Sequence, residues 1–279
     1  MADRTPCHSS CARPAHAWLN QASRQSFGLS RAALGATIEA PRERSRLMKN
    51  SLVIPCFNEA RSLPELLVRC RQVVAESPAT EVVLVDNGST DESPALLAGF
   101  SNASGVRAIR VEPNRGYGHG IVAGLRAARG ERLGWTHADL QTDPRDALAG
   151  FASFDGARDP ERLFVKGRRY GRPLGDVAFT VGMSVFESAL LQKPLWDINA
   201  QPTLFHRSFF ERWSEPPADF ALDLFAYGLA VREGLVVQRF PVAFGVRAHG
   251  SSHWNVDFPS KLKFIRRTVS FSLELRQRL

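Results

Sequence analysis

The 279-residue sequence lacks the features that mark secreted, membrane-spanning or disulfide-stabilised proteins. Its four cysteines follow neither the spacing of a zinc site nor that of a disulfide framework, which favours a reducing compartment. No run of eighteen apolar residues is present, so no membrane span is expected, and the amino terminus lacks the apolar core of a secretory signal. The expected location is therefore the cytoplasm.

A concentrated positive charge is also missing from most of the chain, although the formal net charge is +8. Half of this excess belongs to residues 1–47, which hold seven arginines and three acidic residues. Because this stretch is rich in Ser, Ala and Pro, we predict a disordered arm, or an arm produced by a mis-assigned start ahead of Met48. No basic run is interleaved with aromatic residues, so nucleic-acid binding is not favoured.

From Met48 onward, short apolar runs alternate with helical patterns. This alternation predicts a parallel sheet with helices on both faces, and the second strand should be buried on both faces. In such sheets, ligands bind beyond the carboxyl ends of the strands. The predicted strands are residues 51–55, 81–85, 106–111 and 132–136, with helices between them, the first at residues 62–76.

Polar loops follow three of these strands, at residues 56–60, 86–91 and 137–143. Because the ends of parallel strands meet at one edge of a sheet, we expect the three loops to converge on one crevice. Asn58 is also placed to cap the helix predicted at residues 62–76. The polar residues expected at the crevice are Asn58, Glu59, Asp86, Asp91, Asp139 and Asp143.

The acidic loop carries His137, Asp139, Gln141 and Asp143 at alternate positions. In an extended chain these four side chains would share one face. Carboxylate and amide oxygens suit a hard divalent cation, which predicts a metal site. The alternative is a polar turn that opens a helix at Pro144.

Seven short motifs, in order between residues 51 and 255, resemble the family 2 glycosyltransferases of GT-A fold. Within that family, the sequence looks most like the branch of dolichol-phosphate mannose synthase and the polyprenyl-phosphate glycosyltransferases. The motifs are residues 53–59, 85–91, 114–118, 138–141, 167–170, 197–202 and 247–252. The glycines of the third motif lack dinucleotide-fingerprint spacing and permit either close helix packing or close approach of a ligand.

This resemblance implies an α/β fold of GT-A type, with a Rossmann-like, mostly parallel central sheet and helices on both faces. The implied domains are the arm at 1–47, the catalytic domain at 48–258 and a basic amphipathic helix at 259–279. The implied enzyme is an inverting, metal-dependent hexosyltransferase that moves a sugar from a nucleotide-diphosphate sugar to a polyprenyl phosphate. The alternatives are transfer to a saccharide hydroxyl in polysaccharide synthesis, or a catalytically weak nucleotide-sugar-binding protein.

The resemblance also assigns roles to individual residues. Asp139 and Gln141 would contact Mg²⁺ or Mn²⁺ on the diphosphate, and Arg169 and Arg247 would neutralise that diphosphate. His137 stands where the family usually has an acid, so it is a third candidate ligand or none. The residues implied for nucleotide binding are Pro55, Asn58, Glu59, Asp86, Gly88, Ser89, Asn114 and Gly118. Ser251 and Ser252 resemble the polar turn beside the diphosphate.

Asp219 and Asp223 are the candidates for a base if the acceptor is a hydroxyl. The alternative is that Asp219 caps a helix and Asp223 is solvated. Asn199 and Gln201 would contact sugar hydroxyls or stabilise the turn before Pro202.

Three further segments are open to interpretation. A basic cluster on a predicted mobile loop matches phosphate geometry, with a solvated surface loop as the alternative; its members are Arg162, Lys166, Arg168, Arg169 and Arg172. Residues 179–191 have the spacing of a core helix, with a lipid groove as the alternative. Residues 259–279 would lie on an anionic membrane, giving a peripheral location on its inner face, or would pack against the domain.

Overall fold

The computed structural model describes residues 48–100, 105–245 and 258–278, all within the compact unit Arg44–Leu279. The predicted arm at 1–47 lies outside the described residues. The strands are β1 (Asn50–Cys56), β2 (Thr80–Asp86), β3 (Val106–Arg110), β4 (Arg132–Trp135), β5 (Leu163–Tyr170), β6 (Thr203–His206) and β7 (Val236–Ala243). The helices are α1 (Leu63–Glu76), α2 (Ser93–Phe100), α3 (Tyr117–Ala127), α4 (Asp146–Ala152), η1 (Pro160–Arg162), α5 (Leu174–Leu191), α6 (Arg207–Glu211), α7 (Leu222–Arg232) and α8 (Phe258–Arg278).

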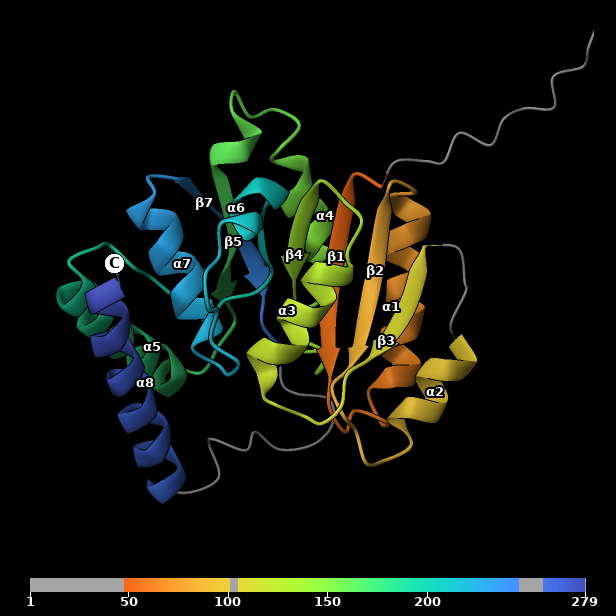
Figure 1. Ribbon diagram of the computed structural model, residues 1–279, viewed down its shortest axis with the longest axis horizontal. Helices are drawn as coiled ribbons and strands as arrows, with labels where there is room; N and C mark the ends of the chain where they lie inside the picture. The colour runs from red at the N-terminus through yellow and green to blue at the C-terminus, as the bar shows by residue number, and fades with distance from the viewer. Residues whose placement is uncertain (1–47, 101–104, 246–257, 279) are drawn as a thin grey trace, which may run out of the picture. The chain divides into compact units, whose positions relative to one another are not determined.

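The seven strands form one sheet in the order β3-β2-β1-β4-β6-β5-β7 (Figure 1). The first four strands run parallel, β6 is antiparallel to both of its neighbours, and β7 is parallel to β5. Cys56 lies opposite Asp86 in the register of β1 and β2, so both strands end at the same edge. The prediction of a mostly parallel α/β sheet is confirmed.

Two apolar layers cover the sheet. One contains side chains of α3, α6 and α7, and the other contains those of α1, α2 and α4. Figure 1 shows α3 in front of the strands. Every residue of β2 is buried, so the predicted burial of this strand on both faces is confirmed.

Helix α5 was predicted to place its apolar side chains in the core, and that prediction is wrong. Phe179 and Phe186 are each 38% exposed, whereas the polar residues Ser184 and Glu187 are buried. The polar face is buried because α5 packs against α8, where Ser272 donates a hydrogen bond to Glu187 at 2.7 Å. By length and composition alone, α5 could cross a membrane, which is weak evidence by itself. The sequence of α5 contains Asp176 and Glu187, so it is not an uninterrupted apolar run and was not predicted as a membrane span.

Candidate functional site

The loops after β1 and β2 are fastened to each other. The Asn58 side chain accepts a hydrogen bond from the Thr90 backbone N–H at 2.8 Å, and the Asn58 N–H donates to the Ser89 hydroxyl at 3.1 Å. Asn58 has a φ of 55°, a left-handed conformation that asparagine tolerates better than most residues. The predicted helix cap is therefore wrong, because α1 begins only at Leu63 and Asn58 instead joins two loops.

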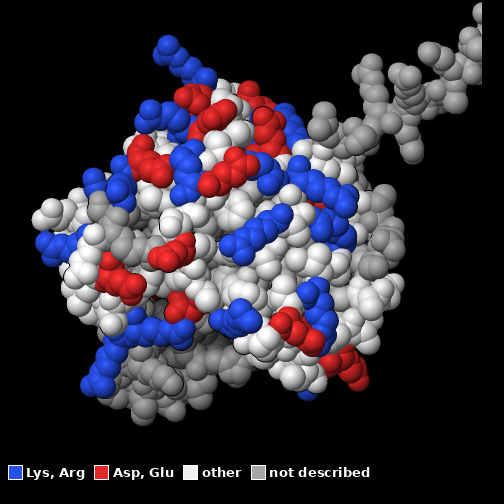
Figure 2. Space-filling model, in the orientation of Figure 1, with Lys and Arg blue, Asp and Glu red and all other residues white. Residues whose placement is uncertain are grey.

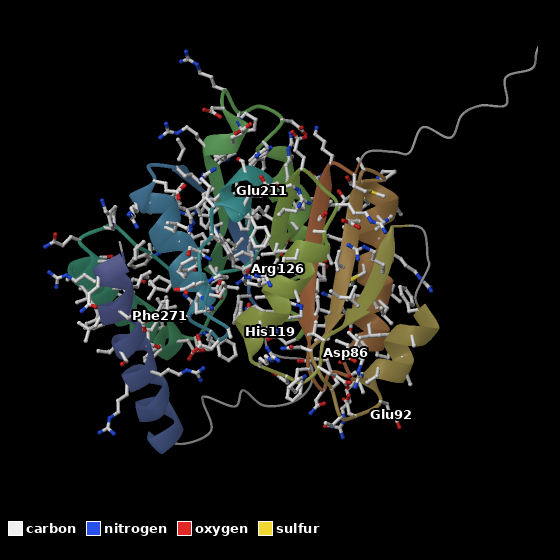
Figure 3. The ribbon with its side chains drawn as sticks, in the orientation of Figure 1. Asp86, Glu92, His119, Arg126, Glu211 and Phe271 are labelled. Atoms are coloured by element: carbon white, nitrogen blue, oxygen red, sulfur yellow. The ribbon has the colours of Figure 1, made fainter. Side chains whose placement is uncertain are left out.

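Asp86 is the last residue of β2, and its two partners Ser89 and Arg110 line a surface hollow. Its buried carboxylate accepts a hydrogen bond from the Ser89 N–H at 3.0 Å and pairs with Arg110. Figure 3 shows Asp86 and His119 near the edge where the β1 and β2 arrows end in Figure 1. The hollow is lined by Gly88, Ser89, Thr90, Arg110, Glu112, Pro113 and Asn114. Three of the residues predicted to bind nucleotide therefore lie side by side here.

The other predicted nucleotide residues lie differently. Pro55 is half-buried at the end of β1, and the Glu59 carboxylate accepts a hydrogen bond from the Ser62 hydroxyl at 2.9 Å. Gly118 packs against the main chain, because a Cβ there would stand 2.3 Å from the Pro217 carbonyl oxygen. At Gly118 the structure thus realises close packing, one of the two alternatives for the glycine-rich loop.

The acidic loop does not place its four polar residues on one face. Leu140 has a φ of 60°, so the chain turns between Asp139 and Gln141 instead of running extended. The Asp143 carboxylate pairs with Arg145 at 2.7 Å and approaches Arg69 of α1 at 3.5 Å. Asp143 also accepts a hydrogen bond from the Arg145 N–H, which makes it the turn residue of the alternative prediction.

Asp139 remains the best-placed metal candidate. Its side chain is buried and accepts a hydrogen bond from the Gln141 N–H at 3.1 Å, while the Gln141 amide N–H donates to the Gly245 carbonyl at 3.3 Å. His137 stacks on Tyr117 with ring centroids 5.6 Å apart. Among the described residues, no three His, Cys, Asp or Glu side chains form a cluster that could hold a metal. The carboxylate of Asp139 and the amide oxygen of Gln141 are ligands of the type that a hard cation prefers. Such a cation can bind few protein groups and keep substrate oxygens as its other ligands.

Asp223 is buried rather than solvated, so that prediction is wrong. Its carboxylate accepts a hydrogen bond from the Gln201 side-chain amide at 2.6 Å and lies 3.7 Å from the Lys166 ammonium. The sequence contained a signal for this burial, since Asp223 is flanked on both sides by leucine within an apolar helix. Lys166 was assigned to a surface loop, but it belongs to the buried part of β5, as the apolar run of residues 163–165 directly before it could have indicated.

Arginines surround a second buried carboxylate, that of Asp197. Arg169 donates to it through Nε at 3.0 Å, with Arg172 at 3.8 Å and Arg239 at 3.9 Å. Burial alone would raise the pKa of Asp197, but the hydrogen bonds and charge of Arg169, together with the charge of Arg172, lower that pKa. Arg169, predicted to face the diphosphate, thus pairs with the Asp197 segment. Three arginines against one aspartate leave an excess of positive charge at this end of β5 and β7.

Asp219 lies at the turn before α7. It accepts a hydrogen bond from the Ala221 N–H at 2.8 Å and pairs with Arg267 of α8. The first contact closes a turn ahead of the helix; the predicted cap at Asp219 is wrong, because the cap residue of α7 is Ala221, whose side chain makes no capping hydrogen bond. Asn199 lines a pocket together with Arg169 and residues of α5, α7 and α8. Arg247, Ser251 and Ser252 lie outside the described residues.

Tyr117, at the start of α3, lies between the loop after β4 and the segment before β6. Its hydroxyl is 3.5 Å from the Gln201 amide and 3.5 Å from His137 Nδ1, and its ring stacks on Phe220 at 4.7 Å. Burial, followed by the charges of Asp223 and Asp139, raises the pKa of Tyr117 well above its usual value. Because Tyr117 contacts Gln201, His137 and Phe220, which come from three different segments, we take the space around it as the centre of the candidate site.

The surface charge is dispersed. Figure 2 shows basic and acidic side chains intermingled over the face that it presents. On the described part of that face, the basic side chains form no continuous tract.

Comparison with known proteins gives the family. A model described as glycosyl transferase family 2 matches residues 51–211. An undecaprenyl-phosphate 4-deoxy-4-formamido-L-arabinose transferase of Sodalis glossinidius is 40% identical over 107 residues, which make up 36% of this chain and 32% of that protein. The enzyme of that name from Pseudomonas aeruginosa is 42% identical over 99 residues, 34% of this chain and 29% of its own length. The chain thus matches about a third of the length of these relatives.

Solved structures share the fold. A mannosyltransferase of Pyrobaculum calidifontis, in complex with GDP-Man and Mn²⁺, has a TM-score of 0.56 and 22% identity over 72% of this chain and 58% of that one. Glucosyl-3-phosphoglycerate synthase of Mycobacterium tuberculosis, in complex with Mn²⁺, UDP and phosphoglyceric acid, has a TM-score of 0.62 and 20% identity over 82% of this chain and 78% of that one. The fold is therefore GT-A. Since the family model also covers more than half of the sequence, this chain belongs to glycosyl transferase family 2.

Proposed function

We propose that the protein is an inverting glycosyltransferase that moves a sugar from a nucleotide-diphosphate sugar to a polyprenyl phosphate. The observation that carries this proposal is the position of Tyr117 between two segments that bear carboxylates. Its hydroxyl lies 3.5 Å from the Gln201 amide, which donates a hydrogen bond to Asp223 of α7, and 3.5 Å from His137, two residues before Asp139 in the loop after β4. A reacting centre there would have the leaving group on the Asp139 side and the acceptor on the Asp223 side.

On the donor side, the nucleoside would occupy the hollow lined by Gly88, Ser89 and Asn114. Asp139 and the oxygen of Gln141 would hold Mg²⁺ or Mn²⁺, which when bound stabilises the negative charge of the departing diphosphate. The bond between the anomeric carbon and the diphosphate oxygen breaks as the acceptor oxygen bonds to that carbon from the opposite face. The nucleoside diphosphate leaves with the electron pair, and the configuration at carbon inverts.

On the acceptor side, the arginines around Asp197 support a phosphate-bearing acceptor. Their unbalanced charge would attract an anion, and guanidinium groups match phosphate geometry. A phosphate is already ionised at neutral pH, so it needs no strong base. A saccharide hydroxyl is the second candidate, because Asp223 is a buried carboxylate that could accept its proton. The arginine cluster favours the phosphate.

A lipid acceptor requires access to a membrane, and two helices support contact with one. On α5, Leu174 is 86% and Val185 is 61% exposed, which is unusual for large apolar side chains. On α8, the side chain of Arg267 is 62% exposed and Leu273 is 49% exposed. Exposed apolar and basic side chains suit an anionic membrane surface. The proposed location is the cytoplasm, peripheral on the inner face of the membrane.

The first test is thermal stability with UDP, GDP, CMP and dTDP, each with Mn²⁺ or with EDTA. A ligand that binds only the folded state raises the melting temperature according to its concentration relative to its Kd. A metal-dependent rise with one nucleoside diphosphate would name the donor class. That donor would then be incubated with undecaprenyl phosphate or with an oligosaccharide to identify the acceptor. No rise with any nucleotide would contradict the proposal.

The second candidate function is that of a catalytically weak nucleotide-sugar-binding protein. His137 supports it, because this histidine replaces an acid beside the predicted metal. His137→Asp should raise metal-dependent turnover if His137 is a weakened ligand. An unchanged rate would instead assign His137 to its stacking contact with Tyr117.

A further inference from the structure

Lys166 is a lysine with no exposed surface, on the central part of β5. Its ammonium donates hydrogen bonds to the Ala200 carbonyl at 2.8 Å and to the Thr203 hydroxyl at 2.7 Å. The Asp223 carboxylate lies 3.7 Å away. Lys166 thus connects β5 with the turn before β6 and with α7, three elements that surround the acceptor side of the site.

A buried ammonium is expensive, and its contribution to stability does not explain its presence. Desolvation of the charge is offset only when polar partners surround it, and apolar side chains of similar volume often replace buried ion pairs without loss of stability. A methionine would fill the same space as Lys166. The charge itself is therefore the feature that needs an explanation.

Of the positively charged groups around the Lys166–Asp223 pair, Lys166 is the nearest to Asp223. Asp223 is also influenced by His137, from the loop after β4, and by Arg169 of β5. Lys166 is influenced in addition by Asp197 and by Arg239 of β7. However, both arginines contact Asp197. Burial raises the pKa of Asp223 and lowers that of Lys166 to about 7, so each group opposes the effect of burial on the other.

We propose that Lys166 is a positioning residue whose positive charge holds the Asp223 carboxylate beside Gln201 at the transfer site. The use of Asp223 at that site rests on the proposed function, whereas the pairing of the two residues does not. Without the ammonium, Asp223 would be a buried acid whose main remaining partner is the neutral Gln201 amide. It would then take up a proton more readily and lose its charge.

The direct test is a ¹³C NMR titration of the protein labelled at aspartate Cγ, with the Asp223 signal assigned by its absence in Asp223→Asn. In Lys166→Met, the titration midpoint of Asp223 should rise by at least about one pH unit, a tenfold change in proton affinity. Lys166→Arg, which keeps the charge, should restore most of the shift. The matched control is Lys49→Met, which removes an exposed lysine that pairs with Asp155 at the surface. An Asp223 midpoint that is the same in Lys166→Met and in the wild type would overturn the proposal.

A double-mutant cycle on stability provides a second test in case Lys166→Met does not fold well enough for the titration. Lys166→Met and Asp223→Asn should each lower the urea denaturation midpoint, and the double variant should lose less than the sum of both. Additive losses would also overturn the pairing. With a hydroxyl acceptor, for which Asp223 would be the base, the acidic limb of the kcat–pH profile should move upward in Lys166→Met, which a purely structural lysine would not cause. A wild-type protein inactive with every donor would overturn the proposed function, and the titration alone would then decide the role of Lys166.

Discussion

The two sides of the proposed site, the proposed donor side and the proposed acceptor side, are built from different interactions. On the donor side, the short loops after β1 and β2 are joined by hydrogen bonds between backbone N–H groups and the side chains of Asn58 and Ser89. On the acceptor side, Lys166, Asp197 and Asp223 are charged, buried and paired across segments far apart in the sequence. The donor side therefore consists of hydrogen-bonded turns, whereas the acceptor side consists of buried ion pairs.

This difference predicts different sensitivities to substitution. Loss of one turn contact costs about 1 kcal/mol, because water replaces much of it. Removal of one partner from a buried ion pair costs roughly 3 to 5 kcal/mol, because the other charge stays buried. Substitutions on the donor side should therefore change mainly binding, and those on the acceptor side should change mainly folding.

Substitution of Asp139 should have the largest effect on activity. It departs from the pattern because it should lower turnover, whereas other donor-side substitutions should change mainly binding. Asp139→Asn keeps an oxygen that can accept the Gln141 N–H but loses the negative charge offered to the metal. Since charge stabilisation at a leaving group is commonly worth a hundredfold or more, turnover should fall by about 10²- to 10³-fold with little loss of stability. The measurement is kcat with the identified donor, together with the melting temperature.

Asp143→Asn is the matched control for Asp139→Asn. Asp143 belongs to the same loop, but its carboxylate pairs with Arg145 and approaches α1. Turnover should stay within about twofold of the wild type, because an asparagine preserves the turn. Equal losses in the two variants would mean that the loop acts as a unit and that Asp139 has no special role.

The sequence predicted the donor side better than the acceptor side for a physical reason. The strand ends and turns of residues 50–91 are set by neighbouring residues, so apolar runs and Asp-Asn-Gly signals locate them within one or two positions. The apolar neighbours of Asp223 indicated its burial, but its partners Lys166 and Gln201 come from distant segments, and no local pattern names them. The burial of Glu187 likewise depends on α8, and for that reason the helical spacing of α5 indicated the wrong face.

Glu187 should make the acceptor side sensitive to pH. Burial raises the pKa of this carboxyl to about 7, from 4.5 for the free side chain, although Ser272 donates a hydrogen bond to it. Arg169 lines the same pocket but is paired with Asp197. Because the folded-state pKa is raised, the stability from this group is fully present below pH 4.5 and is lost as pH rises through about 7. The loss is on the order of 3 kcal/mol.

Glu187→Gln should remove this dependence. The variant should be more stable than the wild type at pH 8 and close to it at pH 5, as measured by urea denaturation at both values. Glu274→Gln, at an exposed position of α8, is the control and should leave the difference between the two pH values unchanged. A wild-type protein equally stable at pH 5 and pH 8 would show that Glu187 ionises without cost.

Gly118 tests the contact that joins the two sides. Its Cα packs against the backbone of Pro217 and Asp219, just ahead of α7. Gly118→Ala would place a Cβ 2.3 Å from the Pro217 carbonyl oxygen, and overpacking of this kind costs about 1 to 3 kcal/mol. Gly182→Ala, in α5, has no atom within 4 Å of the added carbon and should stabilise the helix by roughly 0.5 to 1 kcal/mol. Destabilisation by both would mean that glycine matters here through flexibility and not through space.

Asn58 should give the smallest effect and the sharpest view of the donor side. Asn58→Ala removes the acceptor for the Thr90 N–H and places alanine at a φ of 55°, which together should cost about 1 to 2 kcal/mol. Asn58→Gly loses the same hydrogen bond but accepts the backbone conformation, so it should retain more stability. If the two joined loops form the nucleotide site, both variants should bind the nucleotide more weakly, measured by calorimetry, even where Asn58→Gly melts close to the wild type. Weaker binding in Asn58→Ala alone would mean that the site needs the conformation of this turn and not its hydrogen bond.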